Sequence, residues 1–249
     1  MHPIERLRLV ARAEGVSPSL LVREAAAALA GLGDDPVGTV TACRRLVERH
    51  PAIGPMWWLA ARVLTAADAG VEAWRVVTEL DEDPTSARLA AALPADATTL
   101  LLGWPAQAGD GVRMRGDLEV LLVDCAGEAR GLAHRLRNLG METVEVADAG
   151  LGAAVLQSDL VVLEASALGP DGFVATRGSY AAAAVGNRAG IPVWVVAGVG
   201  RALPAPLWEA LGRRLGQDLD EPWERSDEVV PLALADQVVG PHGASPAAD

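Results

Sequence analysis

Residues suited to binding a phosphate stand together at Arg177, Gly178 and Ser179, directly before a small-residue helix expected over roughly 180–188. Free backbone N–H groups and the helix dipole at such a start favour an anion, and the Ser179 hydroxyl can also cap the helix. The Arg177 guanidinium beside them is able to pair with a phosphate. An ordinary helix start with a solvated arginine fits the same residues, so both interpretations stay open.

Arg130 is a second candidate phosphate ligand, because it opens a helix expected over 128–139, directly after the strand end at Asp124-Cys125. The alternative is a surface arginine. A thiolate at Cys125 would be stabilised near Arg130. The alternative for Cys125 is a half-buried structural cysteine.

Three carboxylates each end or follow an expected strand, namely Asp124, Asp148 and Glu164. If the strands are parallel, these side chains converge on one rim of the sheet. There they could accept hydrogen bonds from ribose hydroxyls or act as general bases. Their convergence would also make the rim acidic.

A strand, loop, helix and strand unit between Asp159 and Gly200 positions most of these residues. Its two expected strands, 160–163 and 191–197, are nearly continuous apolar runs, which is typical of a sheet covered on both faces. Connections of this kind are almost always right-handed crossovers between parallel strands. Ligands bind beyond the carboxyl ends of such strands, so the polar loop expected over 164–179 is the first place to look for function.

The residues before this unit divide at Pro94. Up to that point apolar residues recur at helical spacing, and helices are expected to open at Asp35-Pro36 and at Pro55. Cys43 lies on the apolar face of one of these helices, so we expect it in the core.

From Pro94 onward, strands and helices alternate. Further strands are expected over 98–102, 118–123, 142–146 and 228–234, further helices over 151–157 and 204–215, and a polar loop over 107–116. The pattern predicts an α/β protein with a mostly parallel sheet domain over residues 94–239. An all-helical N-terminal domain over residues 1–93 precedes it, and a disordered tail over residues 240–249 follows it.

Composition excludes several functional classes. The 249 residues carry a net charge of −12 and no basic cluster, which argues against nucleic acid as a partner. The chain has no lysine for Schiff-base chemistry, and its two cysteines form neither a disulfide framework nor a zinc site. No apolar run approaches the ~18 residues that a membrane span needs. We expect a soluble, cytoplasmic protein without metal, cofactor or membrane partner.

Three segments carry a resemblance to a known family. They are SDLVVLEASALGPDGFVATRGSYAAAAVGNRAGIPVWVVAG, GEARGLAHRLRNLGMETVEVADAG and HPAIGPMWWLAARVL, and together they cover most of residues 50–200. With the order of elements, they resemble the alpha, beta and delta regulatory subunits of eukaryotic translation initiation factor 2B. They are also similar to the related methylthioribose-1-phosphate and ribose-1,5-bisphosphate isomerases. The resemblance implies a Rossmann-like C-terminal domain and a homodimer formed through it.

The resemblance also implies a ligand-binding cleft. The family's asparagine-glycine loop matches Asp171-Gly172, its glycine-threonine pair matches Gly178-Ser179, and its glycine-arginine pair matches Ala129-Arg130. Arg177 precedes the second of these pairs and would contact the same ligand.

Both catalytic positions of the isomerases are changed. This chain has Gly103 and Trp104 where the isomerases carry a catalytic cysteine, and Trp104 either lines the cleft or packs in the core. Ser166 stands where they carry a catalytic aspartate. Glu164 with Ser166 is the only local pair that could substitute for that aspartate, and Cys125 is the nearest cysteine.

The favoured interpretation is a non-catalytic protein that binds a phosphorylated sugar or nucleotide beyond the strand ends for a regulatory or assembly role. It is favoured because the anion-binding positions are partly kept while both catalytic positions are lost. One alternative is an aldose–ketose isomerase with an altered acid/base set such as Glu164 and Cys125. The other is a structural interaction protein without a ligand.

Overall fold

The computed structural model describes residues 5, 10, 18–32, 35–125, 127–216 and 221–247. The chain forms two compact units, one of Met1–Asp83 with Val199–Leu219 and one of Pro84–Gly198 with Asp220–Asp249. The expected single division at residue 93 is therefore wrong. The chain passes between the units three times, because residues 199–219 return to the helical unit after most of the sheet is built.

Five described helices make up the helical unit: α2 (Pro18–Ala30), α3 (Pro36–Arg49), α4 (Gly54–Thr65), α5 (Ala69–Asp81) and α11 (Ala205–Leu215). The expected start at Asp35-Pro36 is confirmed, because the Asp35 carboxylate accepts a hydrogen bond from the Gly38 N–H at 2.9 Å. Cys43 is buried in the core of this unit, as expected, and burial raises the pKa of its thiol to about 12. No helix in the described residues is long and apolar enough to cross a membrane.

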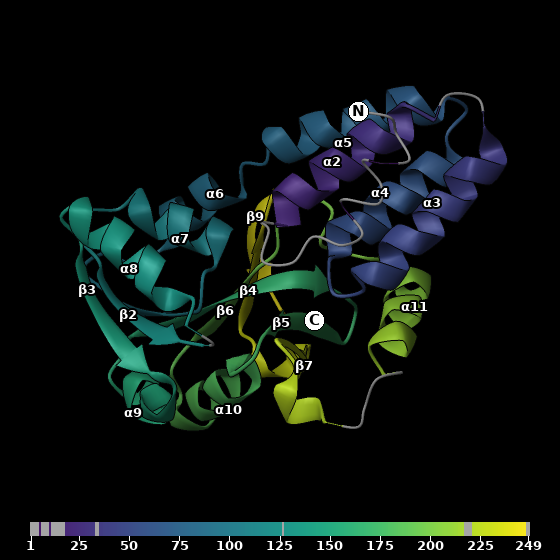
Figure 1. The fold of residues 1–249 in the computed structure, drawn as a ribbon. Helices are drawn as coiled ribbons and strands as arrows, with labels where there is room; N and C mark the ends of the chain where they lie inside the picture. The colour runs from purple at the N-terminus through teal and green to yellow at the C-terminus, as the bar shows by residue number, and fades with distance from the viewer. Residues whose placement is uncertain are drawn as a thin grey trace. The chain divides into compact units, whose positions relative to one another are not determined.

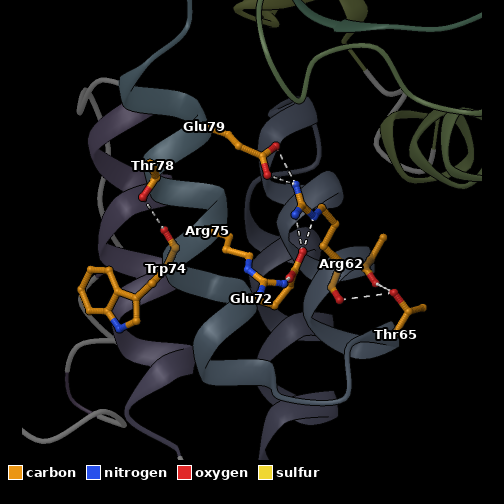
Figure 2. A network of polar contacts seen from close by, with 8 residues as sticks. Arg62, Thr65, Glu72, Trp74, Arg75, Thr78 and Glu79 are labelled. Atoms are coloured by element: carbon orange, nitrogen blue, oxygen red, sulfur yellow. Dashed lines mark hydrogen bonds and ion pairs between the residues drawn. The ribbon is translucent and has the colours of Figure 1, made fainter.

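An arginine on α4 joins that helix to α5 (Figure 2). Arg62 Nη1 donates to both carboxylate oxygens of Glu79, at 2.7 Å each, and the guanidinium also pairs with Glu72. The same guanidinium lies over the Trp58 ring, 4.9 Å from its centroid. Because the Glu72 side chain is only 12% exposed, Arg62 neutralises a carboxylate that is largely withdrawn from water.

The α/β unit is built on a sheet of mostly parallel strands. Seven of them are β1 (Thr98–Leu102), β2 (Glu119–Asp124), β3 (Glu142–Ala147), β4 (Leu160–Leu168), β6 (Val193–Val196), β8 (Gln237–Gly240) and β9 (Gly243–Pro246). Their order is β3-β2-β1-β4-β6-β8-β9, and every pair is parallel except β8 with β9. The expected fold class, a Rossmann-like sheet preceded by a helical region, is confirmed.

Helices cover both faces of this sheet (Figure 1). On one face lie α6 (Thr85–Ala92), α7 (Ala106–Arg113) and α8 (Ala129–Asn138); on the other lie α9 (Leu151–Leu156) and α10 (Ser179–Ala189). The strands alternate their buried side chains between the two faces; Leu101 and Leu122 belong to the first core, and Leu100 and Leu163 to the second. This double coverage explains the continuous apolar runs in the sequence.

The loop expected over 164–179 is mostly a β-hairpin. β4 continues to Leu168 beyond the parallel sheet, and β5 (Gly172–Thr176) returns antiparallel to it. A further strand, β7 (Asp227–Pro231), pairs antiparallel with β5. The strand expected over 228–234 is correspondingly shorter, because a 3-10 turn follows at Leu232–Leu234. The sequence pattern did not predict β5, because its only large apolar side chains are Phe173 and Val174 and its other residues are small.

Two more expectations are wrong. The polar loop expected over 107–116 contains α7, whose glycines permit close packing; a Cβ at Gly111 would lie 2.8 Å from Leu89 Cδ2 of α6. The tail expected to be disordered forms β9 up to Pro246, because its backbone completes a ladder with β8. Residues 248–249 lie outside the described residues.

Removing the Arg62 side chain is expected to destabilise the helical unit. R62A leaves the withdrawn Glu72 carboxylate without its main partner and should lower the free energy of unfolding by about 2 kcal/mol. R75A is the matched control, because Arg75 is 67% exposed and meets Glu72 at 3.3 Å; it should cost about 0.5 kcal/mol or less. Urea unfolding followed by tryptophan fluorescence measures both, and equal losses would contradict the assignment.

Candidate functional site

The candidate site lies where the carboxyl ends of β1 and β2 meet the loop between β5 and α10. Gly103 follows β1 with φ +63, and a Cβ there would lie 3.6 Å from Glu128 Oε2 and 3.8 Å from Thr176 Oγ1. Gly178 has φ +93, and a Cβ there would lie 3.5 Å from Cys125 Sγ. The structure thus brings Gly103, Gly178 and Cys125 to one rim, where glycines admit the left-handed backbone.

The start of α10 differs from the expected serine cap. Gly178 is the N-cap residue, no side chain caps the helix from that position, and Ser179 is 1% exposed inside the first turn. The first-turn N–H of Tyr180 instead donates to Glu228 Oε1 at 2.6 Å. A carboxylate of the chain itself therefore lies where an anion was expected.

Arg177 is held by the segment that precedes β7. Its backbone N–H donates to the Ser226 carbonyl at 2.8 Å, and its Nη1 donates to the Trp223 carbonyl at 3.4 Å. The guanidinium is only partly exposed and lies close enough to Cys125 to influence its titration. Arg177 therefore stays beside the rim.

Arg130 and Trp104 lie at the start of α8. Arg130 is exposed on the first turn of α8 and makes no ion pair with the described residues. The Trp104 ring lies against α8, where a Cβ at Gly131 would be 2.3 Å from it, yet the side chain remains 46% exposed. Trp104 therefore lines the rim and is not part of the core.

Cys125 is at the rim, but its thiol is not poised to ionise. The residue is 2% exposed. Burial, together with the nearby carboxylates of Asp148, Asp124 and Glu128, raises the pKa of the Cys125 thiol to about 11, and the opposing effect of Arg177 is smaller. The stabilised thiolate considered from the sequence does not form, because burial and three carboxylates outweigh one arginine.

Glu164 and Ser166 are engaged in structural hydrogen bonds. Glu164 Oε2 accepts from the backbone N–H groups of Gln107, at 2.7 Å, and Ala108, at 2.9 Å, at the start of α7. Ser166 Oγ donates to the Val174 carbonyl at 3.2 Å, where the ladder of β4 with β5 shifts register. Neither oxygen is free to move a proton on a substrate without losing these bonds.

Asp171 and Gly172 lie at the far end of the hairpin. Gly172 begins β5 and pairs with Pro231, and the Asp171 carbonyl accepts from the Leu232 N–H at 2.9 Å. The four residue steps from Gly172 to Thr176 span ~13 Å of strand. The structure therefore does not bring Asp171 and Gly172 together with Gly178 at the rim.

Asp124 and Asp148, the other rim carboxylates, do approach Cys125. Asp124 Oδ1 also accepts from the Ala129 N–H at 3.0 Å, at the start of α8. In the part of the chain that the structure describes, no three His, Cys, Asp or Glu side chains gather as a metal site would require.

Comparison with known proteins identifies the fold. No protein-family model and no curated protein sequence matches the chain. The solved translation initiation factor eIF-2B of Pyrococcus horikoshii is 16% identical, with a TM-score of 0.82 over 98% of this chain and 96% of that one. The chain has the eIF2B fold. The tetrameric eIF2B-beta2-delta2 complex of C. thermophilum aligns at 18% identity and TM-score 0.79, over 98% and 90%.

An enzyme shares this fold as well. The 5-methylthioribose 1-phosphate isomerase of Pyrococcus horikoshii is 16% identical, with a TM-score of 0.65 over 98% of this chain and 84% of that one. The resemblance seen in the sequence is therefore confirmed at the level of fold. Because the eIF2B fold carries both enzymes and subunits of an assembly, the role of this chain depends on its own site.

Sequence reasoning missed two residues of the rim, Glu228 and Trp223. Both follow the last helix and lie more than forty residues after Arg177 in the sequence, so no local pattern places them beside α10. The only sequence signal was an acidic residue next to an apolar run at 229–230, which predicts a strand and says nothing about its neighbour.

The raised pKa of Cys125 predicts a slow thiol. In a C43A background, alkylation of Cys125 by iodoacetamide at pH 8 should be at least ~100-fold slower than that of an exposed cysteine, because little thiolate is present. The rate should rise about tenfold per pH unit up to about pH 11 while the fold persists, and mass spectrometry follows it. Alkylation at the rate of a free peptide thiol would show that Cys125 is accessible and ionised.

Proposed function

We propose that this protein is a non-catalytic protein of the eIF2B fold that acts by binding, in a regulatory or assembly role. The observation that carries the proposal is the use of all three candidate catalytic groups by the fold itself. Glu164 caps α7, Ser166 bonds the Val174 carbonyl, and the Cys125 thiol is buried with a raised pKa. An acid/base pair needs groups that can exchange protons with a substrate near neutral pH.

The ligand class that the rim favours is a phosphorylated small molecule, a sugar phosphate or a nucleotide. Arg130 and Arg177 supply cationic donors at the starts of α8 and α10, and guanidinium groups match phosphate oxygens well. Gly103 and Gly178 adopt the left-handed backbone that brings their two loops together at the rim. Exposed Trp104 offers an apolar ring beside Arg130 for a sugar or a base.

An interaction protein without a small ligand is the second candidate function. Three aromatic side chains are exposed around the rim, Trp104 at 46%, Tyr180 at 45% and Trp223 at 67%. Trp and Tyr with Arg are the residues that most often dominate binding energy at protein interfaces. The simplest partner is a second copy of the chain, bound through the α/β unit.

Thermal unfolding with a panel of ribose phosphates, methylthioribose-1-phosphate and adenine and guanine nucleotides tests the first candidate. A ligand at 100 times its Kd adds about 2.7 kcal/mol of stability, so we expect Tm to rise by about 5 °C or more. R177A and R130A should each weaken that stabilisation. R188A, on the exposed C-terminal turn of α10, is the matched control and should behave as wild type.

A turnover assay with the same sugar phosphates separates the proposal from an isomerase. We expect no isomerisation by the wild-type protein. Measurable turnover that E164Q abolishes while ligand stabilisation persists would identify an active acid/base group and overturn the non-catalytic proposal. Absence of stabilisation by any compound in the panel would favour the interaction protein.

Sedimentation equilibrium tests self-association. We expect wild-type protein to sediment at twice the chain mass of 25.8 kDa. If the rim forms the contact, W223S should weaken dimerisation by about tenfold or more, because a truncated hot-spot tryptophan typically costs that much. W74S, at an exposed tryptophan of the helical unit (Figure 2), is the control. A wild-type monomer at micromolar concentration would end the homodimer proposal.

A further inference from the structure

Residues 221–228, here called the strap, lie against the loop that begins α10. Three hydrogen bonds hold them there: Arg177 N–H to the Ser226 carbonyl at 2.8 Å, Arg177 Nη1 to the Trp223 carbonyl at 3.4 Å, and Tyr180 N–H to Glu228 Oε1 at 2.6 Å. The strap follows Tyr180 by more than forty residues. Its last residues run into β7, which packs against α10 (Figure 1).

The strap delivers a carboxylate to a position that suits an external anion. The first N–H groups of a helix have no partner within the helix and carry its positive dipole end. Arg177, two positions before the first helical N–H groups, adds a full positive charge. Glu228 supplies the negative charge from a separate strand, and its bond to Tyr180 is exposed to solvent.

The other two helices of the rim are capped in a different way. Asp124 caps α8 from only five residues before Ala129. Glu164 caps α7 with two hydrogen bonds from β4, which is paired on both sides within the parallel sheet. Glu228 lies on β7, whose ladder is with β5 alone. Because its bond to Tyr180 is exposed to solvent, whereas those of Asp124 and Glu164 are partly buried, Glu228 is the most readily displaced of the three.

The geometry points to Glu228 as a built-in competitor for the ligand of the rim. Its carboxylate occupies the place of a phosphate at the start of α10, and a phosphorylated ligand binds by turning Glu228 out to solvent. Arg177 then exchanges the Trp223 carbonyl for the phosphate, which loosens the strap. The inference rests on the proposed function, because it concerns the same site, and it makes ligand binding and release of the strap one event.

The only tyrosine of the chain allows a direct test. Protein labelled with ¹⁵N-tyrosine gives one backbone amide resonance, that of Tyr180, which donates to Glu228. We expect E228Q to shift this resonance. Titrated with inorganic phosphate, E228Q should show a saturable further shift at a concentration at least about tenfold lower than wild type, because a charged competitor is removed.

E224Q is the matched control, since Glu224 lies on the same strap, is exposed, and has no side-chain bond to α10. It removes the same charge and should titrate as wild type, whereas R177A in the E228Q background should lose the phosphate response. A Tyr180 resonance unmoved by E228Q would refute the contact. Phosphate binding to E228Q no tighter than to wild type and E224Q would refute the competition. If E228Q gains phosphate but the compound panel stabilises neither protein, the competitor stands and the proposed ligand class fails.

Discussion

The need to satisfy the first N–H groups of three helices shapes the rim of the sheet. A buried donor without a partner costs about 1–3 kcal/mol. At this rim the first N–H groups of α7 and α8 are partly buried, while that of α10 is exposed to solvent. The chain supplies each with one of its own carboxylates, from Glu164, Asp124 and Glu228. The same hydrogen bonds that satisfy the starts of these helices therefore engage the carboxylates of the rim.

The length of β4 extends this constraint to distant parts of the chain. Its first half is parallel to β1 and β6, and its second half leaves the sheet to pair with β5. β5 then provides the ladder for β7, so residues 221–231 return to the rim through backbone hydrogen bonds. Without this extension, Arg177 and the start of α10 would lose their hydrogen bonds to Trp223, Ser226 and Glu228. The hairpin therefore holds the strap against the rim, through the pairing of β5 with β7.

Sequence patterns predicted the elements that are determined by interactions between residues close in the chain. The apolar run at 160–163 and the capping signal at Asp35-Pro36 each predicted an element correctly, because burial on two faces and a local cap act within a few residues. α7 was missed, since its glycines have low helix propensity and its cap comes from Glu164 on another strand. Arg177 and Gly178 were singled out in the sequence because they directly precede an expected helix. The partners of that start, Glu228 and Trp223, arrive through tertiary pairing alone.

The charges at the rim decide where a ligand can bind. Burial is the largest cause of the raised pKa of the Cys125 thiol; the carboxylates of Asp148, Asp124 and Glu128 raise this pKa further, whereas Arg177 lowers it. A phosphate placed there would be repelled by the same three carboxylates. At the start of α10 the helix dipole meets one carboxylate, Glu228, whose bond to Tyr180 is exposed to solvent, and Arg177 lies two residues before the helix. The start of α10 is therefore the proposed anion site, where a ligand would bind at Tyr180 in exchange for Glu228.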